Sequence, residues 1–125
     1  SNVNAFDISV ILNNALGNAM ENAGSNESPY VSVYSYRRKN AYMIEVRNSF
    51  TGHIRWDKES GLPITSKERA GGYRKSHKYE EIYNYEKNHG YGLENIRKMA
   101  REYAGDIDIV QKNGEFCLSV MLMLA

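Results

Sequence analysis

Two stretches of the chain carry apolar residues at the three-to-four-residue spacing of a helix that buries one side. The first covers residues 7–23, where Asp7 is placed to cap the start and Gly24 to end the helix. The second begins at Gly92 and ends at Gly105. Their apolar stripes consist of Ile8, Ile11, Leu12, Ala15, Ala19 and Ala23 in the first and Leu93, Ile96, Met99, Ala100, Tyr103 and Ala104 in the second. Each stretch predicts an amphipathic helix.

Four further stretches alternate apolar and polar residues, which is the pattern of strands. Residues 30–38 and 41–47 are separated by the turn Lys39–Asn40. Residues 106–112 and 115–124 are separated by Asn113–Gly114, a pair typical of tight hairpins. The order helix, two strands, helix, two strands predicts an α+β fold, a two-layer sandwich in which helices cover a mixed or antiparallel sheet.

The segment between the second strand and the second helix is unusual. Residues 49–88 are dense in charged residues and tyrosines, contain several glycines and have few aliphatic side chains. A connection of this length without structure of its own is usually a functional lid or a linker. We expect residues 50–88 to form a lid that is mobile without ligand, with a short helix around residues 79–85.

Composition narrows the class of protein. The 125 residues suit a single domain over residues 1–125, and the early start of the first helix indicates a piece of a longer chain. Sixteen basic against fifteen acidic residues argue against a dedicated nucleic-acid binder. The single Cys117 fits a reducing compartment, and no apolar run approaches the ~20 residues of a membrane span. The histidines lack metal-ligand spacing, and no nucleophile set stands out, so no catalytic residue is predicted.

The first predicted helix carries two asparagines one turn apart, Asn14 and Asn18, whose side chains point in the same direction. Mg²⁺ takes oxygen ligands and binds through a few protein groups together with substrate phosphates. An amide can complete such a shell without adding charge repulsion. The pair therefore indicates either a metal–phosphate site or a solvated polar face, and the helix alone leaves both open.

The second predicted helix is preceded by a glycine-rich turn that ends in Gly90-Tyr-Gly92-Leu93. Glycines let backbone N–H groups approach phosphate oxygens, and the dipole of the following helix favours an anion there. Arg97 and Lys98, in the second turn, could add positive charge. The alternative is an ordinary turn before a helix, since this short motif is weak evidence alone.

Taken together, the two segments resemble conserved boxes of a known family. Asn14-x-x-x-Asn18-Ala resembles the N-box, and Gly90-x-Gly92-Leu93-x-Asn95 the G2 box, of the ATP-binding domain of sensor histidine kinases. That domain belongs to the GHKL, or Bergerat-type, superfamily, with gyrase-type ATPases, ninety-kilodalton chaperones and mismatch-repair proteins. Residues 7–21, together with residues 65–67 before the G2 box, are most similar to the peptide-responsive quorum-sensing kinases of Gram-positive bacteria.

The resemblance implies roles for individual residues. Asn18 would be the Mg²⁺ ligand and Asn14 its helper near the phosphates, while Lys67 would reach in from the lid. Asn48 stands where family members usually carry an aspartate that binds the adenine amino group, and Gly52 matches the second glycine of that box. The remaining nucleotide-binding positions would be His89, Gly90, Gly92, Leu93, Asn95 and Arg97.

Three positions depart from the family pattern. Asn48 can accept a hydrogen bond but without charge assistance, and Phe50 replaces the first glycine of its box. Glu21 stands where many histidine kinases have lysine. These departures leave open a degenerate GHKL-type binding module with weak or no nucleotide binding that acts through protein contacts.

The resemblance also implies a function. The chain would bind ATP and Mg²⁺ and, within its full-length protein, act as a protein-histidine kinase of a two-component system. Its partners would be a dimerisation domain of the same protein, which carries the phosphoacceptor histidine, and a cognate response regulator. The chain would be the cytoplasmic domain of a membrane-bound sensor, and by itself it would lack kinase activity.

Overall fold

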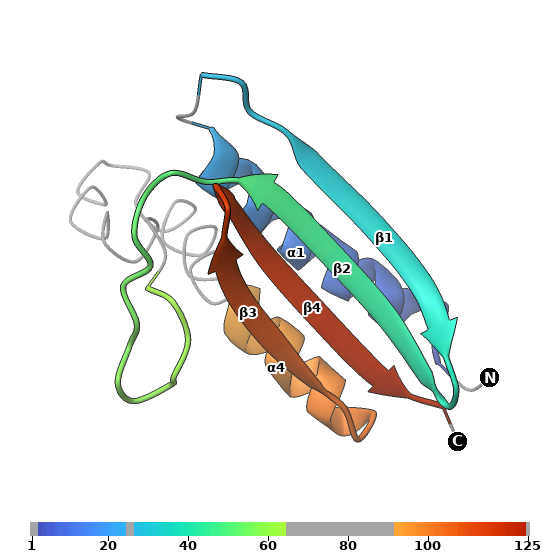
Figure 1. Ribbon diagram of the computed structural model, residues 1–125. Coiled ribbons are helices and arrows are strands. Elements are labelled where there is room, and N and C mark those ends of the chain that lie inside the picture. The colour runs from blue at the N-terminus through green and yellow to red at the C-terminus, as the bar shows by residue number, and fades with distance from the viewer. Residues whose placement is uncertain (1–2, 25–26, 65–91, 125) are drawn as a thin grey trace, which may run out of the picture.

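The computed structural model describes residues 3–24, 27–64 and 92–124 (Figure 1). Most of the predicted lid, including the short helix expected around residues 79–85, lies outside the described residues, as do Lys67, His89 and Gly90.

The described elements form two layers. One layer is a sheet of four strands in the order β1-β2-β4-β3, in which every neighbouring pair is antiparallel. Helices α1 (Ala5–Ala23) and α4 (Gly92–Glu102) lie together behind one face of this sheet (Figure 1). The structure thus confirms the predicted α+β sandwich, with a sheet that is antiparallel throughout its described strands.

The strands follow the predicted hairpins closely. β1 (Val31–Arg38) pairs with β2 (Ala41–Ser49), and β3 (Asp106–Lys112) pairs with β4 (Glu115–Met123). Asn113 and Gly114 both have positive φ, as the tight turn requires. β2 extends two residues beyond the predicted end, because Asn48 and Ser49 continue the pairing with Phe116 and Glu115.

The start of α1 corrects the sequence prediction. The N-cap is Asn4, whose side-chain oxygen accepts a hydrogen bond from the backbone N–H of Phe6 at 2.7 Å. Asp7 is therefore in the first turn, where the helix dipole favours a carboxylate. Asparagine and aspartate are equally good N-caps, and here Asn4, three residues before the predicted Asp7, takes that role.

The carboxylate of Asp7 instead accepts a hydrogen bond from the hydroxyl of Tyr103, which follows α4. The same hydroxyl oxygen accepts a hydrogen bond from the backbone N–H of Asn4 at 3.1 Å. Hydrogen bonding to Asp7 is the main cause that raises the pKa of Tyr103 above its ordinary value. Tyr103 thus joins the first turn of α1 to the end of α4.

The end of α4 depends on two residues. Ala104 adopts a left-handed conformation with φ of 59°, and the N–H of Gly105 donates to the carbonyl of Ala100 at 2.9 Å. Gly105, expected to be the stop, is needed for a different reason: a Cβ atom there would lie 1.7 Å from the carbonyl oxygen of Met121. The backbone at this position therefore lies too close to β4 for any residue with a side chain.

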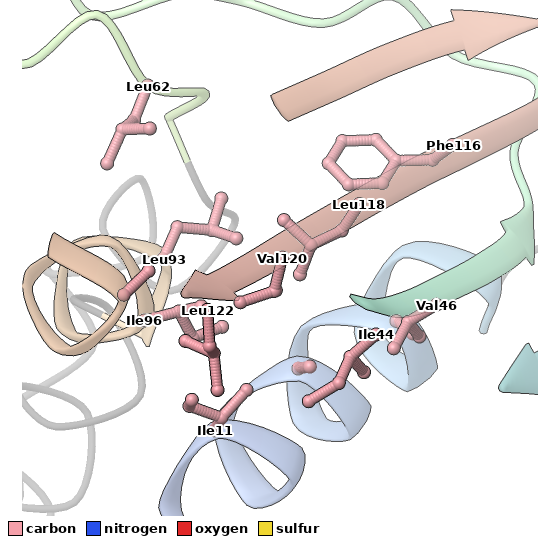
Figure 2. Packing of buried hydrophobic residues seen from close by; sticks show 13 residues of the cluster. Ile11, Ile44, Val46, Leu62, Leu93, Ile96, Phe116, Leu118, Val120 and Leu122 are labelled. Carbon is pink, nitrogen blue, oxygen red and sulfur yellow. The ribbon is translucent and has the colours of Figure 1, made fainter. Parts of the chain in front are cut away.

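The core lies between the two layers (Figure 2). The central strands β2 and β4 send alternate side chains inward, and the helices meet them with branched apolar residues and alanines. Alanines let the helices approach the sheet closely. The largest fully buried apolar side chains are Ile11, Ile44, Val46, Ile96, Leu118, Val120 and Leu122. Neither described helix is both long and apolar enough to cross a membrane.

The first part of the predicted lid has a definite path. Trp56 pairs with Pro63 in an isolated bridge, and the backbone N–H of Asp57 donates to the carbonyl of Leu62 at 2.8 Å. Leu62 is 5% exposed and belongs to the core (Figure 2). Residues 50–64 therefore return to the body of the domain, with Leu62 in the core and Phe50 and Ile54 packed against it.

Candidate functional site

The two sequence motifs meet where α1 packs against the start of α4. Gly92 is buried, and a Cβ atom there would lie 3.4 Å from Oδ1 of Asn14. The amide nitrogen of Asn14 donates to the carbonyl of Val10 at 2.9 Å. This bond fixes the side chain with its oxygen toward Gly92, so an amide oxygen lies beside the first residue of α4.

Asn18 lies one turn further along α1, about 6 Å from Asn14 along the helix axis. Its Oδ1 accepts a hydrogen bond of 3.3 Å from Nδ2 of Asn22. Asn18 and Asn22 form one wall of a pocket of about 160 Å³. The other lining residues come from the loop after β2 and from β4: Phe50, Gly52, His53, Ile54, Arg55, Pro63, Ile64 and Phe116.

Two aromatic rings form the inner wall of this pocket. Phe50 and Phe116 pack edge to face, with ring centroids 5.8 Å apart and planes at 80°. The backbone N–H of Phe50 donates to the carbonyl of Gly114 at 2.8 Å, which holds the loop against the β3–β4 turn. The bulky residue at the first glycine position of the box thus gives the pocket a wall.

Asn48 is next to this wall but is not itself among the residues that line the pocket. It is the strand partner of Phe116 and precedes Phe50 by two residues. Its side chain is completely buried, and its nitrogen donates to the carbonyl of Ser49 at 2.9 Å. Its Oδ1 atom is buried without a hydrogen-bond partner. A buried acceptor left unpaired costs about 1–3 kcal/mol, so this position favours a ligand that brings a donor.

None of the predicted site residues of α4 lines this pocket. Leu93 is 2% exposed and packs in the core. Arg97 donates to the carbonyl of Ser60 at 2.6 Å and so holds the loop that follows β2. Asn95 is exposed and, together with Arg97, lines a shallow hollow on the outer side of α4. The structure brings together Asn14 with Gly92, and Asn18 with Gly52, while Asn95 and Arg97 lie elsewhere.

The oxygen donors around α1 suit one kind of metal site only. Within the described ranges, no group of three histidine, cysteine or acidic residues is placed to hold a metal ion. The described residues therefore form no metal site in which histidine, cysteine or acidic side chains supply all the ligands. One or two amide oxygens, from Asn18 and Asn14, fit Mg²⁺ that keeps waters and shares phosphate oxygens with a bound substrate.

Sequence reasoning missed part of the pocket lining. Phe116 could have been identified, because the Asn113–Gly114 turn fixes the register of β3 and β4 and leaves Phe116 facing inward. Arg55 and Pro63 could not, because the loop that carries them has no periodicity from which its path could be derived. Arg55 places a positive charge at the pocket that the sequence analysis had sought at Arg97.

Comparison with known proteins is consistent with this geometry. The model of a family described as the GHKL domain matches residues 3–123. No curated protein sequence matches the chain. Among solved structures, the chain is similar to the catalytic domain of histidine kinase ThkA in a nucleotide-free form, with a TM-score of 0.59 and 18% sequence identity. That alignment covers 94% of this chain and 65% of the ThkA chain, and at this identity it describes the shared fold.

Proposed function

Because the chain belongs to the GHKL domain family, we propose that its pocket binds ATP and that the chain is the ATP-binding catalytic domain of a sensor histidine kinase. The observation that carries this proposal is the unpaired, fully buried Oδ1 of Asn48 beside an aromatic pocket wall. A family likeness alone would leave the pocket without a stated ligand. A ligand with a hydrogen-bond donor would satisfy the unpaired acceptor, and the adenine amino group is such a donor.

The adenine end of the nucleotide would lie in the pocket beside Phe50 and Phe116, and the wall that these rings form would have to open for the base to reach the buried Asn48. The amide oxygen accepts a hydrogen bond from the adenine amino group, and the rings of Phe50 and Phe116 give an apolar surface for the base. The described walls enclose about 160 Å³, less than the roughly 300–1,000 Å³ of a typical ligand pocket. They therefore account for one end of the nucleotide.

The phosphate end would lie at the start of α4. Gly92 gives the phosphates access to backbone N–H groups at a helix N-terminus, where the dipole favours negative charge. Asn14 and Asn18 would hold Mg²⁺ together with the phosphate oxygens, and Lys67 would add a positive charge. When bound, the metal neutralises charge on the phosphates. The protein's own contribution is to orient the nucleotide, which is the main requirement of phosphoryl transfer.

The wider function follows from the same proposal. The phosphoacceptor histidine would be supplied by a dimerisation domain of the same full-length protein, and the phosphoryl group would pass on to a response regulator. The proposed membership among peptide-responsive kinases rests on the sequence motifs at residues 7–21 and 65–67. The parent protein would then be a membrane sensor with this domain on its cytoplasmic side.

A second candidate function is a nucleotide-free binding module. Phe50 favours it, because its ring contacts Phe116 where family members have a glycine. Isothermal titration of the chain with ADP and Mg²⁺ separates the two candidates, and a ligand that binds only the native state must also raise the melting temperature. Saturable binding supports the ATP-binding function. The absence of both binding and thermal stabilisation at millimolar ADP would reject it in favour of the binding module.

A further inference from the structure

The sheet has two open edges among the described strands, β1 on one side and β3 on the other (Figure 1). An edge strand presents a row of unpaired backbone N–H and C=O groups. In each hairpin the two residues that flank the turn exchange backbone hydrogen bonds. Along each edge strand, every second residue therefore points its backbone N–H and C=O toward the partner strand, and the residues between them point these groups toward the open edge. The hydrogen bond from Ser49 N–H to the carbonyl of Tyr30 agrees with this alternation. The free groups belong to Val31, Val33, Ser35 and Arg37 of β1 and to Ile107, Ile109 and Gln111 of β3.

The same two edges carry exposed apolar side chains. Among large apolar residues within the described strands, only four are exposed, and all four lie on edge strands. They are Val33 at 45%, Tyr34 at 51% and Tyr36 at 39% on β1, and Val110 at 44% on β3. Central strands β2 and β4 have none. Strand pairing at these edges would cover both the free backbone groups and the apolar side chains.

The two edges also carry opposite charges. β1 ends in Arg37 and Arg38, and Lys39 follows in the turn; none of the three has a carboxylate within ion-pair distance among the described residues. β3 carries Asp106 at its first position and Asp108 at its third. Both aspartates are exposed, and Asp106 already pairs with Arg101 at 3.3 Å. In an antiparallel pair the last residues of one strand meet the first residues of the other, so the basic and acidic ends would coincide.

We propose that β1 of one copy of this chain pairs antiparallel with β3 of a second copy, with Arg38 opposite Asp106. This register aligns seven residues of each strand, Ser32–Arg38 with Asp106–Lys112. It sets Tyr34 against Val110, so that two exposed apolar side chains meet on the face of the sheet away from the helices. It also places Ser35 opposite Ile109, and both residues have free backbone groups. Charge, apolar contact and hydrogen-bond phase therefore select the same pairing.

A symmetric pairing of β1 with a second β1 fits less well. It would also use the free backbone groups, but it would leave the basic ends of both strands without a carboxylate opposite them. The proposed contact is head to tail, because each copy uses β1 toward one neighbour and β3 toward the other. Such contacts do not close on themselves in general, so association should continue past a dimer as concentration rises. The proposal does not depend on nucleotide binding.

Sedimentation velocity over a range of concentrations tests this interface with charge-reversal variants of the full chain. Arg38→Glu and Asp108→Lys should each weaken association roughly five-fold, as expected for an exposed strand pair whose attraction is lost. Asp108 is chosen because Asp106 also bonds to Arg101 and to its neighbour's N–H. In this register Asp108 is diagonal to Arg38, so the double variant Arg38→Glu/Asp108→Lys in one chain should associate more tightly than Arg38→Glu alone, because the introduced lysine attracts the introduced glutamate of the neighbouring copy while Asp106 still faces it. Lys58→Glu and Glu59→Lys, in an exposed loop, are the matched controls and should change nothing.

A backbone variant tests the hydrogen bonds independently of charge. Ser35→Pro removes an N–H that points away from β2, a position where an edge strand tolerates proline. Association should fall about ten-fold or more while the circular dichroism spectrum stays unchanged. If this variant fails to fold, amide exchange of the unaltered chain replaces it, with protection of residues 33, 35 and 37 increasing with concentration. No association at millimolar protein, or weakening by Arg38→Glu without any by Asp108→Lys, would overturn the proposed pairing.

Discussion

Replacing Asn48 with leucine should weaken adenine nucleotide binding without destabilising the domain. In the structure the Asn48 amide makes one hydrogen bond, to the carbonyl of Ser49, and buries one oxygen without a partner. Loss of the bond costs about 1 kcal/mol, whereas removal of the unpaired oxygen returns about 1–3 kcal/mol. Leucine has a similar volume, so no large cavity forms. The free energy of unfolding of the nucleotide-free protein should stay the same or rise by up to about 2 kcal/mol.

Nucleotide binding should change in the opposite direction. The variant cannot accept a hydrogen bond from the adenine amino group, which corresponds to roughly a five- to ten-fold loss in affinity for ADP. Guanine carries a carbonyl oxygen where adenine carries its amino group, so the preference for ADP over GDP should narrow in Asn48→Leu. Urea unfolding gives the stability, and calorimetric titration with each nucleotide in the presence of Mg²⁺ gives the affinities.

The combination of results makes this experiment decisive. Weaker ADP binding in a domain of equal or greater stability can only arise at the site. The opposite result would be a free energy of unfolding, measured by urea titration, that is lower by more than about 2 kcal/mol in Asn48→Leu, together with an unchanged ADP affinity. The amide would then have a structural role, and the reasoning from its unpaired oxygen would be wrong.

Three further predictions concern other parts of the domain. Asn18→Ala should abolish calorimetrically measured Mg·ADP binding, whereas Asn13→Ala, on the exposed side of the same helix, should leave it intact. Gly105→Ala should lower the free energy of unfolding by about 3 kcal/mol in urea titration, because a carbonyl oxygen of β4 lies 1.7 Å from the new Cβ. The pKa of Glu45 is held below its ordinary 4.5, first by the Tyr36 hydroxyl and then by Arg47. Its contribution to stability is therefore present above that value and lost as pH falls through the lowered pKa. Tyr36→Phe should raise the pKa of Glu45 in an NMR titration and make the acid-side loss of stability smaller.

The elements of the fold could be predicted because each has a local cause. Apolar spacing predicted the two helices and four strands that the structure describes, and Asn113–Gly114 placed the turn of one hairpin at the correct two residues. The errors occurred at element ends, where several residues were suitable. Asp7 was predicted to cap the first helix, but the cap is Asn4, and the Asp7 carboxylate accepts a hydrogen bond from the hydroxyl of Tyr103, nearly a hundred residues away in the sequence. A contact of that kind cannot be derived from local pattern.

The site was predictable only in part, for a similar reason. The roles proposed for Asn14, Asn18 and Gly92 came from motifs, and the structure places Asn14 beside Gly92 as two packed helices would require. Arg97 was expected near the phosphates because it is positively charged and lies in the second turn of the helix that follows the glycine-rich segment. In the structure it binds the carbonyl of Ser60, since the loop after β2 returns across α4 at that point. The course of that loop has no signature in residue spacing, so this use of Arg97 could not be foreseen.

The attachment of α1 to α4 at two separate points limits how the domain can move. The hydroxyl of Tyr103 holds the first turn of α1, and Asn14 touches Gly92 at the opposite end of α4. Ten residues of α1 separate Asn4 from Asn14, about 15 Å, and eleven residues of α4 and its end separate Gly92 from Tyr103, about 16 Å. Because the two spans are nearly equal, the antiparallel helices are attached to each other at both ends of α4. Sliding or rotation of one helix against the other would break an attachment, so the pair must shift as one rigid unit and the surrounding loops must absorb any rearrangement.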